Sequence, residues 1–111
     1  MKRYGVVAHP SFEADVRKDV LWWTERDPSR AEEIAELIQE AALLLRRFPE
    51  IGPPVLVRRR PDANLRHLIL GRSGYLLFYE VEHDHQRVVL MRLRHEKQRP
   101  LHSERRRPPR P

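Results

Sequence analysis

Five side chains in the second half of the sequence could together hold an anion and move a proton. The imidazole of His95 can gain or lose a proton near neutral pH, which makes it the candidate general base. Arg72, Arg92 and Arg99 can hold a negatively charged group, and the hydroxyl of Tyr79 can donate a proton. This combination suits proton transfer at a bound phosphate. The same residues are also compatible with surface arginines, a core tyrosine and a histidine at the end of a strand, and the sequence leaves both interpretations open.

The sequence does not predict a metal or cofactor site. Residues 83–85, His-Asp-His, lie in a polar turn, where alternating histidines are usually solvated. His95 and the glutamate after it begin like the helix of a zinc protease, but Arg99 occupies the position of the second histidine ligand. There is no cysteine, which excludes thiolate metal sites, and residues 71–74 join two strands, so they cannot act as a phosphate-binding loop before a helix.

Three runs of apolar residues surround these candidates and predict a β-meander. Residues 66–70 and 75–81 are rich in leucine, aromatic and β-branched side chains. The segment between them, from Gly71 to Gly74, suits a short hairpin loop. Residues 87–94 form a third run after a polar turn. We therefore expect three successive antiparallel strands, in which Tyr75 and every second residue after it share one face.

The first half of the sequence predicts a short strand and then a helix. Residues 4–8 are the first strand, and Pro10 suits the first turn of the helix because it loses no useful donor there. Apolar residues recur at helical spacing and predict one buried side, made of Phe12, Val16, Val20 and Trp23. Trp22 must either widen this side or lie exposed, and an exposed Trp22 would indicate a surface that binds a partner.

A second helix is expected from about residue 29 to residue 48. Ser29 and Glu32 have the spacing of a capping box at its start. Proline and glycine within residues 49–54 end it. Apolar residues recur between these limits at alternating steps of three and four, at Ala31, Ile34, Ile38, Ala41, Leu45 and Phe48. Such a narrow seam is typical of an antiparallel helical hairpin that packs on a sheet.

The order strand, helix, helix and three strands predicts an α+β fold, with the two-helix hairpin packed on one face of an antiparallel sheet. A chain of 111 residues with 40% hydrophobic content suits one domain, which we expect over residues 1–97. Residues 98–111 are dominated by arginine and proline, and we expect a disordered tail there. No segment approaches the roughly 20 apolar residues of a membrane span, and the N-terminus lacks the apolar stretch of a signal peptide. We therefore expect a cytoplasmic protein without a membrane partner.

Positive charge is concentrated in the expected strands and tail. Residues 1–54 carry 8 basic and 10 acidic side chains, residues 55–94 carry 8 and 4, and residues 95–111 carry 6 and 2. A basic sheet beside acidic helices would steer an acidic partner to one side of the molecule. The predicted partner-binding residues are Arg66, Arg72, Arg92, Arg94 and Trp22.

Several motifs in a fixed order point to one family. The Pro10 helix start precedes a helical hairpin that leads to Phe-Pro-Glu-Ile-Gly at 48–52, then the hairpin sequence at 66–81, and finally Leu93-Arg94-His95 followed by Arg99-Pro100. In these features, over about residues 3–100, the chain resembles the RelE/ParE superfamily of bacterial type II toxins, also called plasmid stabilisation proteins. The resemblance implies a small toxin in a toxin–antitoxin hetero-oligomer, with a cognate antitoxin that is usually encoded by the adjacent gene. We expect an antitoxin segment with acidic and apolar side chains to cover the basic strands.

The superfamily contains ribosome-dependent messenger RNA endonucleases and poisons of DNA gyrase, and Leu76 separates these two branches. The nuclease branch typically has lysines on the strand before the hairpin and an arginine directly after Gly-Tyr; the matching positions here look like His67, Ile69 and Leu76. Leucine can neither hold a phosphate nor move a proton. The sequence therefore favours a ParE-like toxin that inhibits growth by binding gyrase and is not itself an enzyme. A RelE-like RNA endonuclease that uses the candidates named above is the alternative, and a basic nucleic-acid-binding module is a third.

Overall fold

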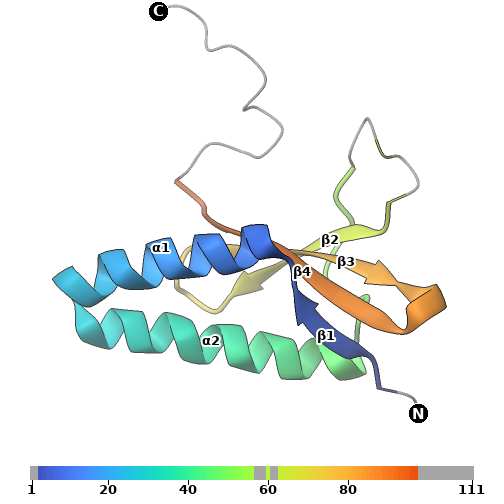
Figure 1. The fold of residues 1–111 in the computed structure, drawn as a ribbon, viewed down its shortest axis with the longest axis horizontal. Coiled ribbons are helices and arrows are strands. Elements are labelled where there is room, and N and C mark those ends of the chain that lie inside the picture. The colour runs from blue at the N-terminus through green and yellow to red at the C-terminus, as the bar shows by residue number, and fades with distance from the viewer. Residues whose placement is uncertain (1–2, 57–59, 61–62, 98–111) are drawn as a thin grey trace, which may run out of the picture.

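The computed structural model describes residues 3–56, 60 and 63–97, and the expected tail at 98–111 lies outside this range. The described residues form two helices and four strands in the expected α+β order (Figure 1). The helices are α1 and α2, and the strands are β1 to β4, with a short 3-10 turn at His83–His85 before the last strand. Their bounds are β1 Gly5–Ala8, α1 Pro10–Arg26, α2 Pro28–Arg47, β2 Leu65–Leu70, β3 Tyr75–Glu82 and β4 Arg87–His95.

The four strands make one sheet in the order β1-β4-β3-β2. The predicted meander is confirmed, because β2 pairs antiparallel with β3 and β3 pairs antiparallel with β4. The N-terminal strand adds a detail that the sequence did not predict. It lies parallel to β4, with Val6 opposite Val88, so the sheet is mixed rather than fully antiparallel. As a result β1 is one edge of the sheet and β2 is the other.

Helix α1 starts where the sequence predicted. Pro10 occupies its first turn, and Nδ1 of His9 accepts a hydrogen bond from the backbone N–H of Ser11 (3.0 Å), which satisfies one free donor at the helix start. Phe12 is buried on the predicted side of the helix, and Trp23 packs against the core at the other end. The neighbouring Trp22 points about 100° away from Trp23 around the helix and is 47% exposed.

Helix α2 starts earlier than predicted, and the expected capping box is wrong. The carboxylate of Asp27 caps the helix by accepting from the backbone N–H of Arg30 (3.3 Å), and the hydroxyl of Ser29 donates to Asp27 (2.9 Å). Asp27 rather than Ser29 is the N-cap because it precedes Pro28, which suits the first helical position. The predicted seam is buried from Ala31 to Leu45, with Ile38 partly buried. Phe48 is 46% exposed, because the helix ends at Arg47 and the chain turns away there.

The core lies between the helices and one face of the sheet. Residues of β3 alternate between buried and partly buried, as period two requires, and the buried set is Tyr75, Leu77, Tyr79 and Val81. Both helices pack against this face, and Figure 1 shows them lying side by side with β1 close to the end of α2. The opposite face of the sheet carries no helix among the described residues.

Candidate partner-binding surfaces

His95, the candidate base, ends β4 against the turn between β2 and β3. The backbone N–H of Glu96 donates to the carbonyl of Gly74 (2.7 Å), and Nδ1 of His95 accepts from the backbone N–H of Lys97 (3.2 Å). The imidazole meets the ring of Tyr75 edge-on, with 5.0 Å between the ring centroids. A Cβ atom at Gly74 would lie 2.8 Å from Nε2 of His95, so only glycine permits this close approach. The structure therefore holds the imidazole in one position beside the hairpin.

A partly buried polar cluster that the sequence did not predict supports this end of the hairpin. The hydroxyl of Tyr75 accepts from Nε1 of Trp23 (3.1 Å) and donates to the carboxylate of Asp19. Burial raises the pKa of the Asp19 carboxyl above its ordinary value, and burial likewise raises the pKa of the Tyr75 hydroxyl. One signal was available in the sequence, because Asp19 stands between Val16 and Val20 on the apolar side of the helix.

The other candidate catalytic residues do not gather around His95. Arg72 is exposed in the β2–β3 turn, at the same end of the sheet as His95, whereas Arg99 lies outside the described residues. Tyr79 is completely buried, and its hydroxyl accepts a hydrogen bond from the backbone N–H of Gly52 (2.9 Å). Burial raises the pKa of the Tyr79 hydroxyl. In this position Tyr79 anchors the chain after α2 and cannot touch a bound molecule.

Arg66, a predicted partner-binding residue, is used within the fold. Its side chain is only 19% exposed. Its guanidinium donates to the carbonyl oxygens of Glu50 (3.1 Å) and Gly52 (2.7 Å) and to Oδ1 of Asn64 (3.0 Å). These bonds fix the segment between α2 and β2, so Arg66 has little freedom to meet a partner.

Two rows of residues cross the face of the sheet that lacks helices. In one row Leu76 of β3 lies between Ile69 and Arg94 in the strand register. In the other, Phe78 lies between His67 and Arg92, and Arg92 forms an ion pair with Asp15 of α1 (Nε to Oδ2, 2.8 Å). Each row thus ends in an arginine on β4. Leu76 is bordered by Ile69 on β2, so an apolar pair stands on this face of the sheet.

A second polar network joins three segments at the opposite end of the sheet. His83 accepts or donates at both ring nitrogens, with Nδ1 2.6 Å from the hydroxyl of Tyr4 and Nε2 2.8 Å from Oε2 of Glu50. Hydrogen bonds from His83 and then from Asn64 lower the pKa of the Glu50 carboxyl. This network positions the start of β1 relative to the β3–β4 turn. The contact spans 79 residues between His83 and Tyr4, a separation that no local sequence pattern encodes.

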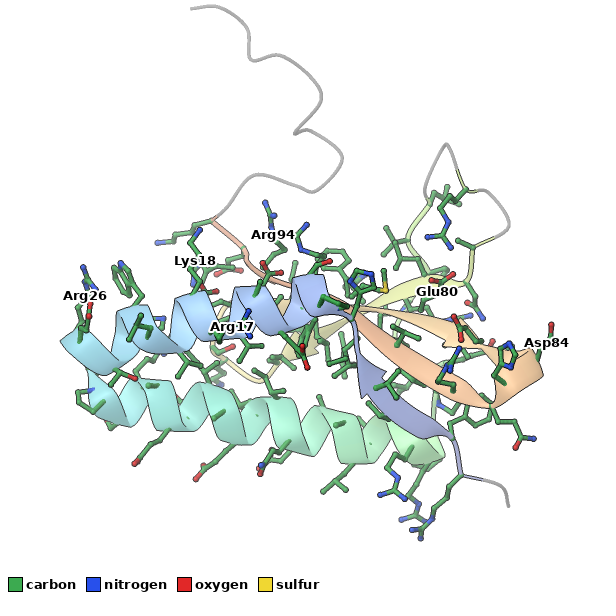
Figure 2. All side chains as sticks on the ribbon, in the orientation of Figure 1. Arg17, Lys18, Arg26, Glu80, Asp84 and Arg94 are labelled. Carbon is green, nitrogen blue, oxygen red and sulfur yellow. The ribbon has the colours of Figure 1, made fainter. Side chains whose placement is uncertain are left out.

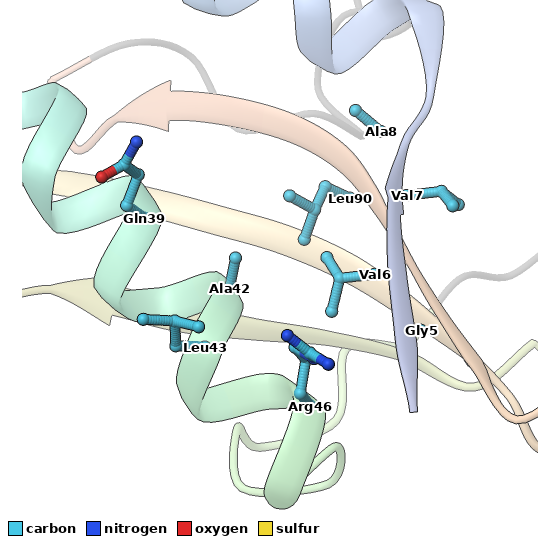
Figure 3. A pocket seen from close by; sticks show the side chains of 9 residues that line it. All are labelled: Gly5, Val6, Val7, Ala8, Gln39, Ala42, Leu43, Arg46 and Leu90. Carbon is cyan, nitrogen blue, oxygen red and sulfur yellow. The ribbon is translucent and has the colours of Figure 1, made fainter. Parts of the chain in front are cut away.

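An open groove of about 610 Å³ runs between β1 and α2 (Figure 3). Figure 3 shows Val6 and Leu90 on the strand side of the groove and Leu43 on the helix side, where Leu43 is 61% exposed. Arg46 is the cation among its lining residues, which are Gly5, Val6, Val7, Ala8, Gln39, Ala42, Leu43, Arg46 and Leu90. The sequence patterns did not predict this surface, although the apolar Leu43, which falls outside the predicted seam of α2, was the available signal.

The outer edge of β1 borders this groove. The backbone N–H groups of Gly5 and His9 donate inward, to the carbonyls of Gln86 (3.0 Å) and Leu90 (2.8 Å). Because the backbone groups of successive residues alternate in direction along a strand, those of Val6 and the residue two positions later face the open side. Within the part of the chain that the structure describes, the groove therefore combines apolar side chains, one arginine and the open edge of β1, which is the set of features that an added strand would need.

A smaller groove of about 220 Å³ lies on the other side of α2, beside β2. It is bordered by Leu44, by Ile69 and by Glu40, and Ile69 is 64% exposed. Helix α2 thus has an apolar groove along each flank. Within the described part of the chain, no three histidine, aspartate or glutamate side chains gather as metal ligands would. Neither helix there is long and apolar enough to cross a membrane.

Comparison with known proteins identifies the family. The family model described as the ParE toxin of the type II toxin–antitoxin system, parDE, matches residues 6–100. The chain therefore belongs to the ParE toxin family. This membership agrees with the resemblance deduced from the sequence and with the α+β fold of this family member. A search of curated protein sequences gave no match.

Solved structures with the same fold come from toxin–antitoxin complexes. A chain of the chromosomal ParDE system from P. aeruginosa superposes on this ParE family member with a TM-score of 0.68 at 17% identity, covering 84% of this chain and 96% of that one. A chain of the RelBE2 complex from Mycobacterium tuberculosis superposes with a TM-score of 0.60 at 23% identity, covering 86% of this chain and 93% of that one. A chain of the archaeal RelE–RelB complex from Pyrococcus horikoshii OT3 superposes with a TM-score of 0.55 at 14% identity, covering 87% of this chain and 99% of that one.

Proposed function

We propose that this chain is a growth-inhibiting toxin that an antitoxin neutralises by inserting a segment between β1 and α2. The observation that carries the proposal is the groove of about 610 Å³ beside an unpaired strand edge. An extended segment could form backbone hydrogen bonds with β1, bury apolar side chains against Leu43 and place a carboxylate near Arg46. The similar structures from ParDE and RelBE complexes support an antitoxin as the partner.

Two leucines provide a matched test of this docking site. Leu43 in the groove and Leu21 on α1 are almost equally exposed, at 61% and 60%, so a charge should cost the free fold little at either position. The chain is coexpressed with the product of the neighbouring open reading frame. With Leu43→Glu, the antitoxin should no longer copurify with the chain and should no longer restore growth. With Leu21→Glu, it should do both, as with the unchanged chain. Equal capture of the two variants would refute docking in this groove.

For the target of the free toxin, we favour DNA gyrase, bound in the cytoplasm without a catalysed reaction. The supporting observation is the apolar pair Ile69 and Leu76, which stands on the helix-free face of the sheet where a nuclease would need cations. The purified chain should stabilise gyrase–DNA cleavage complexes and leave ribosome-bound messenger RNA intact. The opposite pattern would contradict this assignment.

The alternative is a ribosome-dependent RNA endonuclease, and it rests on the placement of Arg72 and His95 at the same end of the sheet. In that case His95 would accept the proton of the 2′-hydroxyl, and arginines would hold the phosphate. A folded variant with His95→Ala, Arg72→Ala and Arg99→Ala should then be harmless to cells. Full toxicity of this triple variant would exclude the endonuclease.

A further inference from the structure

The outer side of α1 carries cations around an exposed tryptophan. Lys18, Trp22 and Arg26 follow one another at intervals of four residues, so they lie in a line along one side of the helix. Arg17 and Leu21 border this line, and all five residues are exposed. Figure 2 shows Arg17, Lys18 and Arg26 spread along α1, with Arg94 of β4 beside the same helix. We refer to Arg17, Lys18, Trp22 and Arg26 as the α1 ridge.

Trp22 is held in a defined orientation although it is 47% exposed. The guanidinium carbon of Arg26 lies 3.9 Å from the centroid of its ring, a cation–π contact, and Nη1 of Arg26 donates to the carbonyl of Trp22 (2.9 Å). The ring of Trp23 meets it at 82°. The indole of Trp23 is bonded within the fold, since its Nε1 donates to the hydroxyl of Tyr75. The core therefore uses one tryptophan and leaves the other as a fixed aromatic surface.

The two aspartates of α1 make their close contacts away from this ridge, although the charge of Asp19 also attracts Lys18. Asp15 binds Arg92 and accepts from the backbone N–H of Leu93 (2.9 Å), and the half-buried Asp19 accepts from Tyr75. On the ridge side, Glu25 contacts Arg26 at 3.6 Å, but both side chains are exposed, so water weakens this pair and Arg26 can still meet a phosphate.

Helix α2 has the opposite character. Glu32, Glu36 and Glu40 lie on its exposed side at intervals of four residues. The helical hairpin therefore presents a basic side on α1 and an acidic side on α2, and an approaching anion should be directed to α1.

We propose that the α1 ridge binds single-stranded nucleic acid. Its cations would contact backbone phosphates, and Trp22 would stack on an unpaired base, a pairing of chemistries that suits single strands. A duplex keeps its bases stacked inside and offers none to a tryptophan on a convex helix. The inference goes beyond the proposed toxin function and does not depend on it, since the ridge lies on a different helix from the α2 grooves.

The test uses the full chain and two 15-nucleotide probes, oligothymidylate and oligouridylate. Binding should quench tryptophan fluorescence, and Trp22→Phe should remove the quench, because Trp23 is bonded to Tyr75. Trp22→Ala should weaken binding by about 5- to 150-fold, the range measured for single stacked bases. Preference for one probe would show which of the two single strands the ridge binds more tightly.

Salt dependence separates the ridge from general charge attraction. Each phosphate contact on a single strand contributes about −0.7 to the slope of log K against log salt, so Lys18→Ala with Arg26→Ala should reduce the slope by about 1.4. Arg3→Ala with Arg47→Ala removes the same charge from exposed positions outside the ridge and should change the slope little.

Four results would overturn the proposal. They are equal losses in the two double variants, unchanged affinity of Trp22→Ala, equal binding of a 15-base-pair duplex, and displacement of the probe by oligoglutamate at the same concentration as by oligothymidylate. The last result would assign the ridge to an acidic protein segment.

Discussion

Replacing Tyr79 by phenylalanine should destabilise the fold without creating a cavity. The ring of Tyr79 is completely buried and would keep its packing, whereas the buried backbone N–H of Gly52 would lose its acceptor, which now lies 2.9 Å away. Leaving a buried donor without a partner costs about 1–3 kcal/mol. A loss of about 2 kcal/mol, at a urea slope of about 1.5 kcal/mol per molar, lowers the unfolding midpoint by about 1.3 M.

The assay is urea unfolding followed by circular dichroism, with Tyr4→Phe as the matched control. The hydroxyl of Tyr4 lies at the surface against His83, so its removal should change the unfolding free energy by no more than about 0.5 kcal/mol. The slope should stay constant in both variants, because neither alters the surface exposed on unfolding. If Tyr79→Phe kept its midpoint but lost toxicity, Tyr79 would act in chemistry and the structural role argued above would be wrong.

Three further changes test other parts of the fold. Gly74→Ala should destabilise the hairpin by about 1 kcal/mol or more, since Gly74 has φ of +85° and a Cβ atom there would meet Nε2 of His95; thermal unfolding measures the loss. Leu45→Ala should cost about 2–5 kcal/mol in urea unfolding, because the side chain is completely buried between α2 and the sheet. Asp19→Asn should gain stability relative to the unchanged chain as pH rises from 3 to 7. The raised pKa of Asp19 means that ionisation weakens the folded state above pH 3.8, while an amide oxygen still accepts from Tyr75; unfolding at both pH values measures the difference.

Local periodicity was sufficient to predict most of the elements. The alternation in β3 follows from a strand with one face on the core, and the seam of α2 follows from a helix with one buried side. The start of α2 was predicted two residues too late because the sequence offers two residues that could cap the helix. Asp27 and Ser29 are both good caps, and Pro28 favours the earlier helix start.

Features that depend on register could not be predicted. The parallel pairing of Val6 with Val88 joins segments that are far apart in sequence, and only the completed sheet brings them together. The same holds for the link between Glu50 and His83, which lie 33 residues apart. The contacts of the candidate site residues could not be predicted from the sequence for the same reason. The sequence located the basic residues. Only the structure shows that Arg66 is bonded within the fold, whereas Trp22 is exposed.

The edges of the sheet suggest how an antitoxin would engage the chain. Beyond its pairing with β1, the edge of β4 is covered by Asp15, which accepts from the backbone N–H of Leu93. The first half of β2 is covered by the preceding segment, since the backbone N–H of Val55 donates to Leu65 (2.7 Å) and that of His67 to Pro53. Among the described residues, this leaves β1 and residues 68–70 open, and each borders a groove beside α2. Open edges favour pairing with another chain, so both should be covered in the complex.

An antitoxin that crosses the outside of α2 would cover both edges, and two adjacent leucines can test this. Leu43 lines the groove beside β1 and Leu44 lines the groove beside β2, with exposures of 61% and 36%. If the antitoxin occupies both grooves, Leu43→Glu and Leu44→Glu should each raise the dissociation constant of the copurified complex, measured by titration calorimetry. Leu21→Glu is the control, because Leu21 lies on α1 away from both grooves. Full affinity of Leu44→Glu would restrict the antitoxin to β1, and Ile69 would then stay exposed in the complex.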